Sequence, residues 1–378
     1  VTLRGSFSYA PSHPGLKGEG AEVAVPGTIF EVYAGAGDEN GTPFATINGN
    51  ATLQGVCVRY PAQKAEAAEP VPYPWTAVLR GNNPAIIDCE LLNPYKAIDA
   101  SRNQRALVRN IHGQAIALGV FVDTVYDIGR IENVHWNPWW SMNSPIYQWQ
   151  LEHGVAFEFA RTDWHYVLNT FCYGYNIGYK FRKSKDGAAN GNFLGIGADD
   201  CYTAVVVEET QPMGLQITNG EFTSFHGPDP VMVRVTPELT GGVRFVNCAF
   251  WGPTNRIAVV DGHGVTGFTD CTFMEWDHKK TGAYAIEAQG GSLIVRGCDF
   301  MEDKPQILLG PDVDRAVITD NLLNGKKRIK KDTKGSVVID DNAESPKSKD
   351  WSEKLDKASG FRAHSRHQRE KAEASKKK

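Results

Sequence analysis

The sequence predicts an all-β solenoid, a parallel β-helix, and three observations support this prediction. Short segments rich in Val, Ile and Phe alternate along the chain with Gly, Asn, Asp and Pro. A pattern of alternating apolar residues, a small polar residue, Cys or Asn, and a large apolar residue recurs about every 20 to 28 residues. Self-similarity at such a period is typical of solenoids. The Leu-x-x-Leu-x-Leu frame of leucine-rich repeats is absent, which favours the β-helix.

The composition is that of a globular chain with a large core. Of the 378 residues, 41% are hydrophobic and 22% are charged. No apolar run approaches the roughly 18 residues that a membrane-spanning helix needs. The net charge of −4 is unevenly spread, because residues 344–378 carry +5 and the remainder carries −9. This acidic body argues against nucleic acid as the main partner.

The chain divides into two regions. We expect residues 1–342 to form the β-helix, with its N-terminal part incomplete because the chain opens in a strand-like segment, VTLRGSF. Residues 343–378 are polar, basic and poor in large apolar residues, so we expect a disordered or helical extension.

The repeat is clearest around the cysteines, as in VRFVNCAF, GFTDCTF and LIVRGCDF. We assign the recurring slot to Cys89, Asn110, Asn133, Asn169, Cys201, Gly220, Cys248, Cys271, Cys298, Asn321 and Asn342. A tight inward bend explains these residue types, because stacked Asn side chains can hydrogen-bond and Cys and Gly are small enough to bury. We therefore expect buried free thiols at five positions, Cys89, Cys201, Cys248, Cys271 and Cys298. No CxxC or Cys/His cluster suggests a zinc site.

The segments that follow each bend alternate as strands of a first sheet should. We expect such strands at 154–160, 176–182, 204–209, 231–235, 256–261 and 284–288. Their outer face would then display charges in successive coils, namely Glu158, Lys180, Arg182, Glu208, Arg234 and Glu287.

This whole pattern resembles the pectate-lyase-like right-handed parallel β-helix superfamily, especially bacterial proteins related to glycoside hydrolase family 28. The resemblance covers roughly residues 1–342. It implies an N-terminal cap, three parallel sheets, and a substrate groove along one sheet flanked by long loops. It is specific for the fold and weak for the reaction.

A tryptophan-rich segment, NPWWSMNSPIYQWQ (137–150), has neither a helical nor a strand period and is predicted to be a loop. It directly precedes the strand that carries Glu158, so it would wall the groove of the first sheet. Five of the nine tryptophans lie close together in sequence, at Trp136, Trp139, Trp140, Trp149 and Trp164. Indole faces pack well on pyranose rings, so the expected ligand is carbohydrate. The alternative is a satellite hydrophobic cluster that anchors a long loop.

Candidate catalytic groups lie on the first sheet and at its edge. The backbones of Glu158 and Glu208 would be about 10 Å apart, which suits the acid and base of an inverting glycosidase. The alternative is a solvated ladder of ion pairs. Asp163 and His165 follow the same strand and are further candidates for general acid or base. Glu152, at the exit of the loop, is a weaker candidate for substrate binding.

Three short segments echo motifs of family 28 polygalacturonases in the right order: ADDC (198–201), GHG (262–264) and RIK (328–330). In that family the acid pair and the histidine meet at one sugar. Here the slots place ADDC and GHG three coils apart, about 14 Å along the axis. We also expect Asp199 and Asp200 to abut the bend on the side away from the first sheet. They are therefore kept only as minor candidates.

Three functions remain open. The first is a glycoside hydrolase acting on a plant, algal or microbial polysaccharide. The second is a polysaccharide lyase, in which Lys180, Arg182 and Arg234 would neutralise a uronate and abstract its C5 proton. The third is a non-catalytic glycan-binding module. We expect a polysaccharide or oligosaccharide partner, no cofactor, and an extracellular or periplasmic location that follows from the substrate; the oligomeric state is left open.

Overall fold

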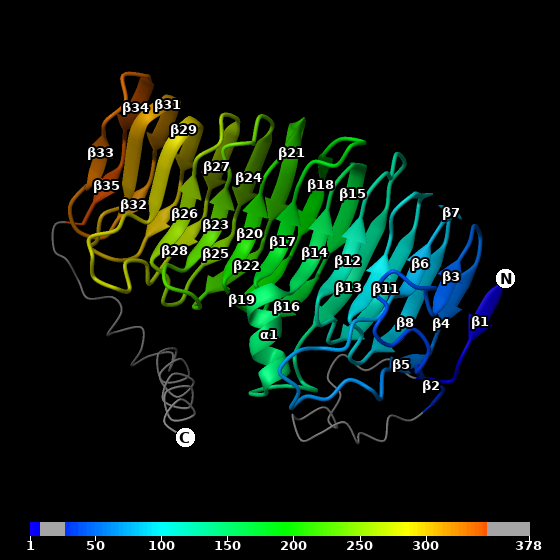
Figure 1. Ribbon diagram of the computed structural model, residues 1–378. Helices are drawn as coiled ribbons and strands as arrows, with labels where there is room; N and C mark the ends of the chain where they lie inside the picture. The colour runs from blue at the N-terminus through cyan, green and yellow to red at the C-terminus, as the bar shows by residue number, and fades with distance from the viewer. Residues whose placement is uncertain (8–26, 346–378) are drawn as a thin grey trace.

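The computed structural model describes residues 1–7 and 27–345, and it is a parallel β-solenoid of about 13 turns (Figure 1). The strand pairings are parallel and fall into three rows, which we call the first, second and third sheets. The predicted all-β solenoid is thereby confirmed. Two short strands, β7 (Gly81–Asn82) and β10 (Asn103–Gln104), pair separately at one edge.

The first sheet contains the strands predicted from the alternation. It consists of β3 (Ala45–Ile47), β6 (Trp75–Leu79), β9 (Lys96–Asp99), β12 (Leu118–Val122), β14 (Val155–Phe159), β17 (Ile177–Phe181), β20 (Thr203–Val207), β23 (Val231–Val235), β26 (Arg256–Val260), the first part of β29 (Ile286–Arg296), the first part of β31 (Ile307–Thr319) and β33 (Ile329–Lys331).

The second sheet follows the first in each coil. It consists of β1 (Thr2–Arg4), β4 (Thr52–Gln54), the first parts of β8 (Ala85–Leu91), β11 (Leu107–Gly113) and β13 (Arg130–Trp136), then β15 (Thr162–Leu168), β18 (Ala189–Leu194), β21 (Thr210–Thr218), β24 (Gly242–Val246), β27 (Val265–Thr269), the last parts of β29 and β31, and β34 (Ser336–Asp340).

The third sheet has the shortest strands. It consists of β2 (Ile29–Glu31), β5 (Cys57–Arg59), the last parts of β8, β11 and β13, then β16 (Phe171–Tyr173), β19 (Gly197–Cys201), β22 (Glu221–Ser224), β25 (Ala249–Phe250), β28 (Thr272–Phe273), β30 (Asp299–Phe300), β32 (Leu322–Leu323) and β35 (Ala343–Glu344).

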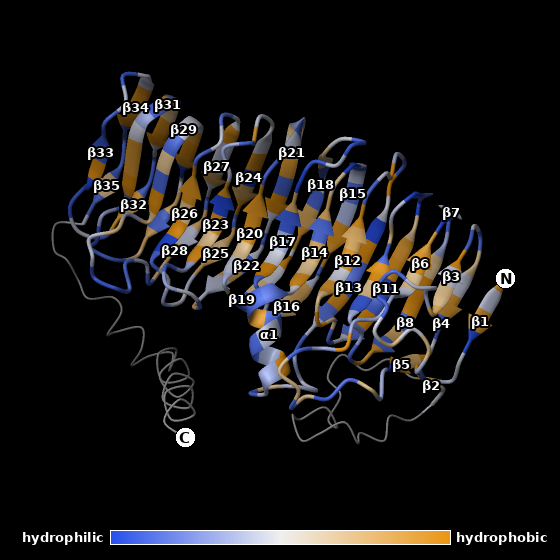
Figure 2. Ribbon diagram, in the orientation of Figure 1, coloured by the Kyte–Doolittle hydropathy of each residue, from blue (hydrophilic) through white to orange (hydrophobic). Residues whose placement is uncertain are grey.

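The core runs along the inside of the coil, as the apolar bands on the strands suggest (Figure 2). Side chains at equivalent positions of neighbouring coils stack on one another. The rings of Phe157 and Tyr179 are 4.8 Å apart and nearly parallel, and Phe159 and Phe181 stack at 5.4 Å. All four are fully buried. Because successive coils repeat this contact, each strand extends a core that its neighbour has already begun.

Each coil turns from the second sheet to the third at a residue in the left-handed conformation. In most coils this residue lies one position before the residue predicted for the slot. Its φ lies between 50° and 67° in every described coil from Gly55 onward, at Gly55, Asp88, Asn110, Asn133, Asn169, Gly195, Asn219, Asn247, Asp270, Gly297, Asp320 and Asp341. Asn, Asp and Gly tolerate this conformation better than other residues. Register pairing shows that Cys89 aligns with Ile111, so most of the cysteines lie one position after the bend.

The asparagine ladder itself is present. Asn133 Nδ2 donates to Asn110 Oδ1 at 2.9 Å, and Asn110 Nδ2 donates to Asp88 Oδ1 at 2.7 Å. Asn247 Nδ2 donates to Asn219 Oδ1 at 2.8 Å in later coils. A one-residue error in the slot was hard to avoid, because two adjacent positions of the turn both favour small or polar residues.

We expect Asn133→Ala to lower the free energy of unfolding by about 2 kcal/mol, because it removes a ladder hydrogen bond and leaves a β-carbon in a left-handed conformation. Asn133→Gly should cost about 1 kcal/mol or less, since glycine adopts this φ freely. Denaturant unfolding of the two variants measures the difference. A glycine variant that is no more stable than the alanine variant would argue against the strained bend.

All seven cysteines are buried free thiols, which confirms the prediction for five of them and adds Cys57 and Cys172. Cys248, Cys271 and Cys298 stack in successive coils. The hydrogen bond with Cys248 lowers the pKa of Cys271, but the hydrogen bond with Cys298 and burial outweigh it and raise this pKa to about 12. Cys201 does not belong to this stack. It ends β19, and the bend of that coil is Gly195.

The predicted loop contains a helix, α1 (Pro145–His153). Ser144 caps it by accepting a hydrogen bond from the backbone N–H of Tyr147 at 3.4 Å, and Pro145 occupies the first turn, where a missing N–H does no harm. The helix lies next to β16 and β19, at the turn from the third sheet to the first (Figure 1). It is nine residues long and is the one helix of the described residues; none there is long and apolar enough to span a membrane.

Candidate active site

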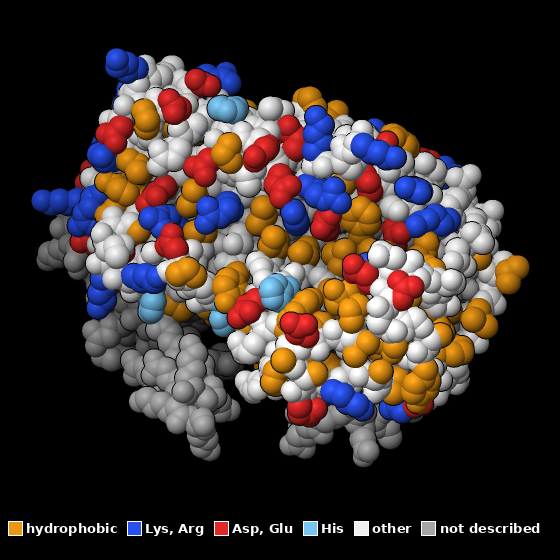
Figure 3. All heavy atoms as spheres, viewed as in Figure 1, with side chains coloured by type: hydrophobic (Ala, Val, Ile, Leu, Met, Phe, Trp, Pro, Cys, Tyr) orange, Lys and Arg blue, Asp and Glu red, His pale blue; other side chains and the backbone are white. Residues whose placement is uncertain are grey.

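The charged residues predicted for the first sheet lie on its outer face, because they alternate along the strands with buried core residues such as Phe157 and Tyr179. Acidic and basic side chains are mixed on the face of the molecule that Figure 3 shows. Glu158 pairs in register with Lys180, and Lys180 with Val206, so Glu208 is displaced by two residues along its strand. With ordinary strand spacings this separates the Cα atoms of the two glutamates by about 12 Å.

Both glutamates are engaged in ion pairs. Arg182 Nε lies 2.5 Å from Glu158 Oε1, and Lys180 Nζ lies 3.0 Å from Glu208 Oε1. The alternating-sign ladder considered for these residues is therefore present. Lys180 and Arg182 therefore bind protein carboxylates, which competes with the binding of a substrate uronate considered for them. Arg234 is half-buried on the same face. Burial raises the pKa of Asp261, and the positive charge of Arg234 partly offsets this rise.

Two of the predicted sugar-binding tryptophans are corrected by the structure. Trp136 has no exposed surface and belongs to the main core. Trp140 is 4% exposed and forms a satellite cluster with Leu92, Ile116 and Ile146. A sugar cannot stack on an indole that protein atoms cover on both faces. The anchoring alternative fits Trp140, whereas Trp136 is part of the main core and of neither predicted arrangement.

The other residues of the inserted segment are partly accessible. Trp149 and Trp139 are half-buried against the satellite cluster, and Glu152 is exposed at the end of α1. The segment lies at the turn between the third and first sheets. The backbone N–H of Ile146 donates to Ala65 O at 3.2 Å, which ties the helix to a loop of an earlier coil.

His165 is also corrected as an acid–base candidate. It is 2% exposed, its ring packs edge-on against Phe159, and its Nδ1 lies 3.0 Å from Thr162 Oγ1. Burial, with the nearby charge of Arg130, lowers the pKa of His165 to about 3. The strand carries a bulge between Thr162 and His165, and His165 after this bulge faces the core.

This buried imidazole predicts acid sensitivity. His165 stays neutral in the folded protein, whereas in the unfolded chain it binds a proton below about pH 6.5. Stability is therefore full above pH 6.5 and falls as the pH drops toward 3. We expect wild type to lose roughly 3 kcal/mol more than His165→Gln between pH 7 and pH 4, measured by denaturant unfolding. Equal losses in the two proteins would show that His165 is not the proton acceptor.

Asp163 is held by a network that leaves it little freedom for catalysis. Arg161 binds both carboxylate oxygens at 2.8 Å, and Oδ1 also accepts from Gln211 at 2.9 Å and Asn190 at 3.2 Å. The hydrogen bonds from Arg161 hold the pKa of Asp163 below its usual value. A general acid must carry a proton near neutral pH, so the lowered pKa argues against Asp163 in that role. Trp164, beside it, is 61% exposed.

Two adjacent aspartates, Asp199 and Asp200, form a candidate site on the third sheet. Ala198 pairs with Phe222 and Cys201 with Ser224, so the two aspartates oppose the single residue Thr223 in a β-bulge. Asp200 adopts a left-handed φ of 56°. Bulges re-aim side chains and are frequent beside active sites.

Three polar side chains contact the two carboxylates. Tyr147 Oη donates to Asp200 Oδ2 at 2.7 Å, and His226 Nε2 lies 2.8 Å from Asp200 Oδ1. Thr223 Oγ1 donates to Asp199 Oδ1 at 2.6 Å and accepts from the backbone N–H of Asp200 at 2.9 Å. Burial and the charge of Asp200 raise the pKa of Tyr147 well above its usual value. Tyr147 therefore keeps its proton and remains a hydrogen-bond donor to Asp200.

Helix α1 delivers Tyr147 to this site. Its ring passes over Gly174, whose φ is 73° and where an added β-carbon would lie 2.3 Å from the tyrosine ring. Gln150 Nε2 donates to Gly174 O at 2.9 Å and fixes the helix on the same turn. The inserted segment therefore contributes Tyr147 to this site.

Aromatic rings flank the acidic pair on the outer face of the third sheet. Tyr202 stacks on His226 with centroids 5.6 Å apart. The partly exposed Tyr173 pairs in register with Asp199. Further along the sheet, His135 contacts the rings of Trp139 and Phe171 at 5.0 and 4.9 Å. Trp139 thus lies on an aromatic face, but on the third sheet rather than the first.

The placement predicted for ADDC was wrong. Because the bend is Gly195, Asp199 and Asp200 lie at the far end of the third-sheet strand, just before Thr203 begins the first sheet. The GHG segment (262–264) follows β26, and RIK (328–330) overlaps the start of β33. Both lie in later coils than Asp199 and Asp200, so the three motifs do not form one site. His226 is the imidazole that meets the pair. The sequence contained evidence for this contact, because Asp200 and His226 each precede a first-sheet strand in consecutive coils.

Comparisons with known proteins name no relative. No family model matches the sequence, and no curated protein matches it significantly.

Proposed function

We propose that this chain is a carbohydrate-active enzyme that hydrolyses glycosidic bonds of a polysaccharide at the third sheet. One observation carries the proposal: the bulge presents two adjacent carboxyl groups, Asp199 and Asp200, together with His226 and a rim of aromatic rings. Hydrolysis of a glycoside needs one carboxyl that protonates the leaving oxygen and one carboxylate on the other side of the bond. A polysaccharide substrate would place the enzyme outside the cytoplasm.

The surroundings of the pair support different roles for its two members. One carboxylate oxygen of Asp200 accepts a hydrogen bond from Tyr147, and the other lies 2.8 Å from His226 Nε2, so this carboxyl is held by two polar partners. We therefore assign Asp200 as the base or nucleophile. Asp199 supplies the second carboxyl, and Thr223 keeps both aspartates in place. Tyr173 and Tyr202 offer ring faces to the sugar beside them.

The test is a panel of neutral and acidic polysaccharides incubated with the full chain. Release of reducing ends without absorbance near 235 nm supports hydrolysis. Absorbance near that wavelength, from an unsaturated sugar, would instead support elimination and return attention to Lys180, Arg182 and Arg234. Retention of a polysaccharide with neither signal would support a non-catalytic glycan-binding protein.

A further inference from the structure

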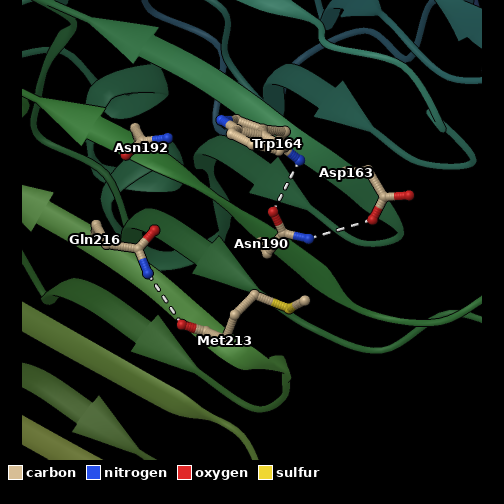
Figure 4. A pocket seen from close by; sticks show the side chains of 6 residues that line it. All are labelled: Asp163, Trp164, Asn190, Asn192, Met213 and Gln216. Atoms are coloured by element: carbon tan, nitrogen blue, oxygen red, sulfur yellow. Dashed lines mark hydrogen bonds between the residues drawn. The ribbon is translucent and has the colours of Figure 1, made fainter.

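A second site lies on the outer face of the second sheet, where a pocket of about 410 Å³ is lined by Asp163, Trp164, Asn190, Asn192, Met213 and Gln216 (Figure 4). We infer that this pocket binds a neutral oligosaccharide, stacked on Trp164, independently of the acidic pair on the third sheet. The inference does not require the chain to be a hydrolase.

The indole of Trp164 is presented by a strained backbone. The bulge in β15 sets Asp163 and Trp164 opposite Asn190, and Trp164 has a φ of 52°. For a bulky side chain this conformation is unfavourable and persists only where its surroundings enforce it. Its ring is 61% exposed, unlike Trp136 and Trp140, so core packing does not explain why a tryptophan stands here.

The backbone of Trp164 is nevertheless firmly held. Its N–H donates to Asn190 Oδ1 at 2.8 Å, and Asn190 Nδ2 donates to Gln211 Oε1 at 2.8 Å. Gln211 in turn donates to Asp163, which Arg161 grips with two hydrogen bonds. An exposed aromatic ring on a fixed backbone loses little entropy when a ligand stacks on it.

The rest of the lining suits the hydroxyl groups of a sugar. Asn192 and Gln216 are register partners on β18 and β21, so their backbones are about 4.8 Å apart. In Figure 4 these two amides lie on one side of the pocket and Asp163 on the other. Amides both donate and accept hydrogen bonds, as vicinal hydroxyls require. Met213, 60% exposed, adds an apolar contact next to the indole.

The charge of the lining selects a neutral ligand. Asp163 is the one charged residue among those lining the pocket, and Arg161 neutralises it. A uronate or sulfated sugar would bring a negative charge without a cation in the lining to receive it.

The experiment titrates the full chain with neutral gluco-, xylo-, manno- and galacto-oligosaccharides and one oligogalacturonide, following indole N–H signals by NMR. We expect at least one neutral oligosaccharide to shift the Trp164 signal, Trp164→Ala to weaken its binding at least 10-fold, and Gln216→Ala to weaken it several-fold. Leu194→Ala, an exposed residue on the same sheet outside the lining, is the matched control and should leave binding unchanged.

Several results would overturn the inference. They are the absence of any Trp164 shift at 10 mM of every neutral sugar, tighter binding of the oligogalacturonide, or a change in oligomeric state of Trp164→Ala in sedimentation, which would mark the ring as a contact between copies. Unfolding curves confirm that each variant is folded. Binding that survives in Asp200→Asn separates this pocket from the third-sheet site.

Discussion

An Asp200→Asn variant is expected to lose about 10³-fold in kcat on whichever polysaccharide the panel identifies, with little change in KM. The asparagine keeps the size of the side chain and a hydrogen-bonding oxygen for Tyr147. It removes the negative charge that a base or nucleophile needs, and such groups contribute about 10² to 10⁴-fold. Initial rates of reducing-end release measure the effect.

Glu158→Gln is the control for this substitution. Glu158 is also an acid in an ion pair on the outer surface, but it lies on the first sheet. Its removal should change kcat less than threefold. If Glu158→Gln inactivates the protein and Asp200→Asn does not, the reaction takes place on the first sheet, as the sequence alone suggested.

Trp136→Ala should have the largest effect on stability. Trp136 is fully buried in the main core, and truncation of such a side chain typically costs 3–5 kcal/mol. The cavity would lie beside Gly119 on the neighbouring first-sheet strand, which approaches the indole too closely to accept a β-carbon.

Trp139→Ala serves as the comparison, because this indole is only half-buried against the satellite cluster. We expect it to cost clearly less than Trp136→Ala in denaturant unfolding. A loss below about 1 kcal/mol for Trp136→Ala would contradict its place in the core. Loss of sugar binding with unchanged stability would restore the earlier hypothesis that Trp136 contacts the ligand.

The fold could be predicted from the sequence because each coil of a solenoid repeats the same pattern of apolar and polar residues. The alternation from Val155 to Phe159 and from Ile177 to Phe181 reappears in each coil, so an error in one coil is corrected by its neighbours. The buried cysteines followed from the same repetition. Strand positions and the charged face of the first sheet were therefore predicted from periodicity alone.

Features that occur once were predicted poorly. The bulges at Asp163 and at Asp199 each add a residue to one strand, which reverses the facing of His165 and turns two carboxylates outward. Local alternation does not reveal such an insertion. The helix after Ser144 was missed for a similar reason, since its capping Ser–Pro pair was interpreted as part of a loop. The candidate site depends on these local departures from the repeat.

A crystal structure of the Asp200→Asn variant with an oligosaccharide from a cleaved substrate tests the central claim most directly. We predict sugar density on the third sheet between α1 and His226, with a glycosidic oxygen within hydrogen-bonding reach of Asp199. A sugar bound instead over Glu158 and Lys180 on the first sheet, with the third sheet empty, would contradict the account.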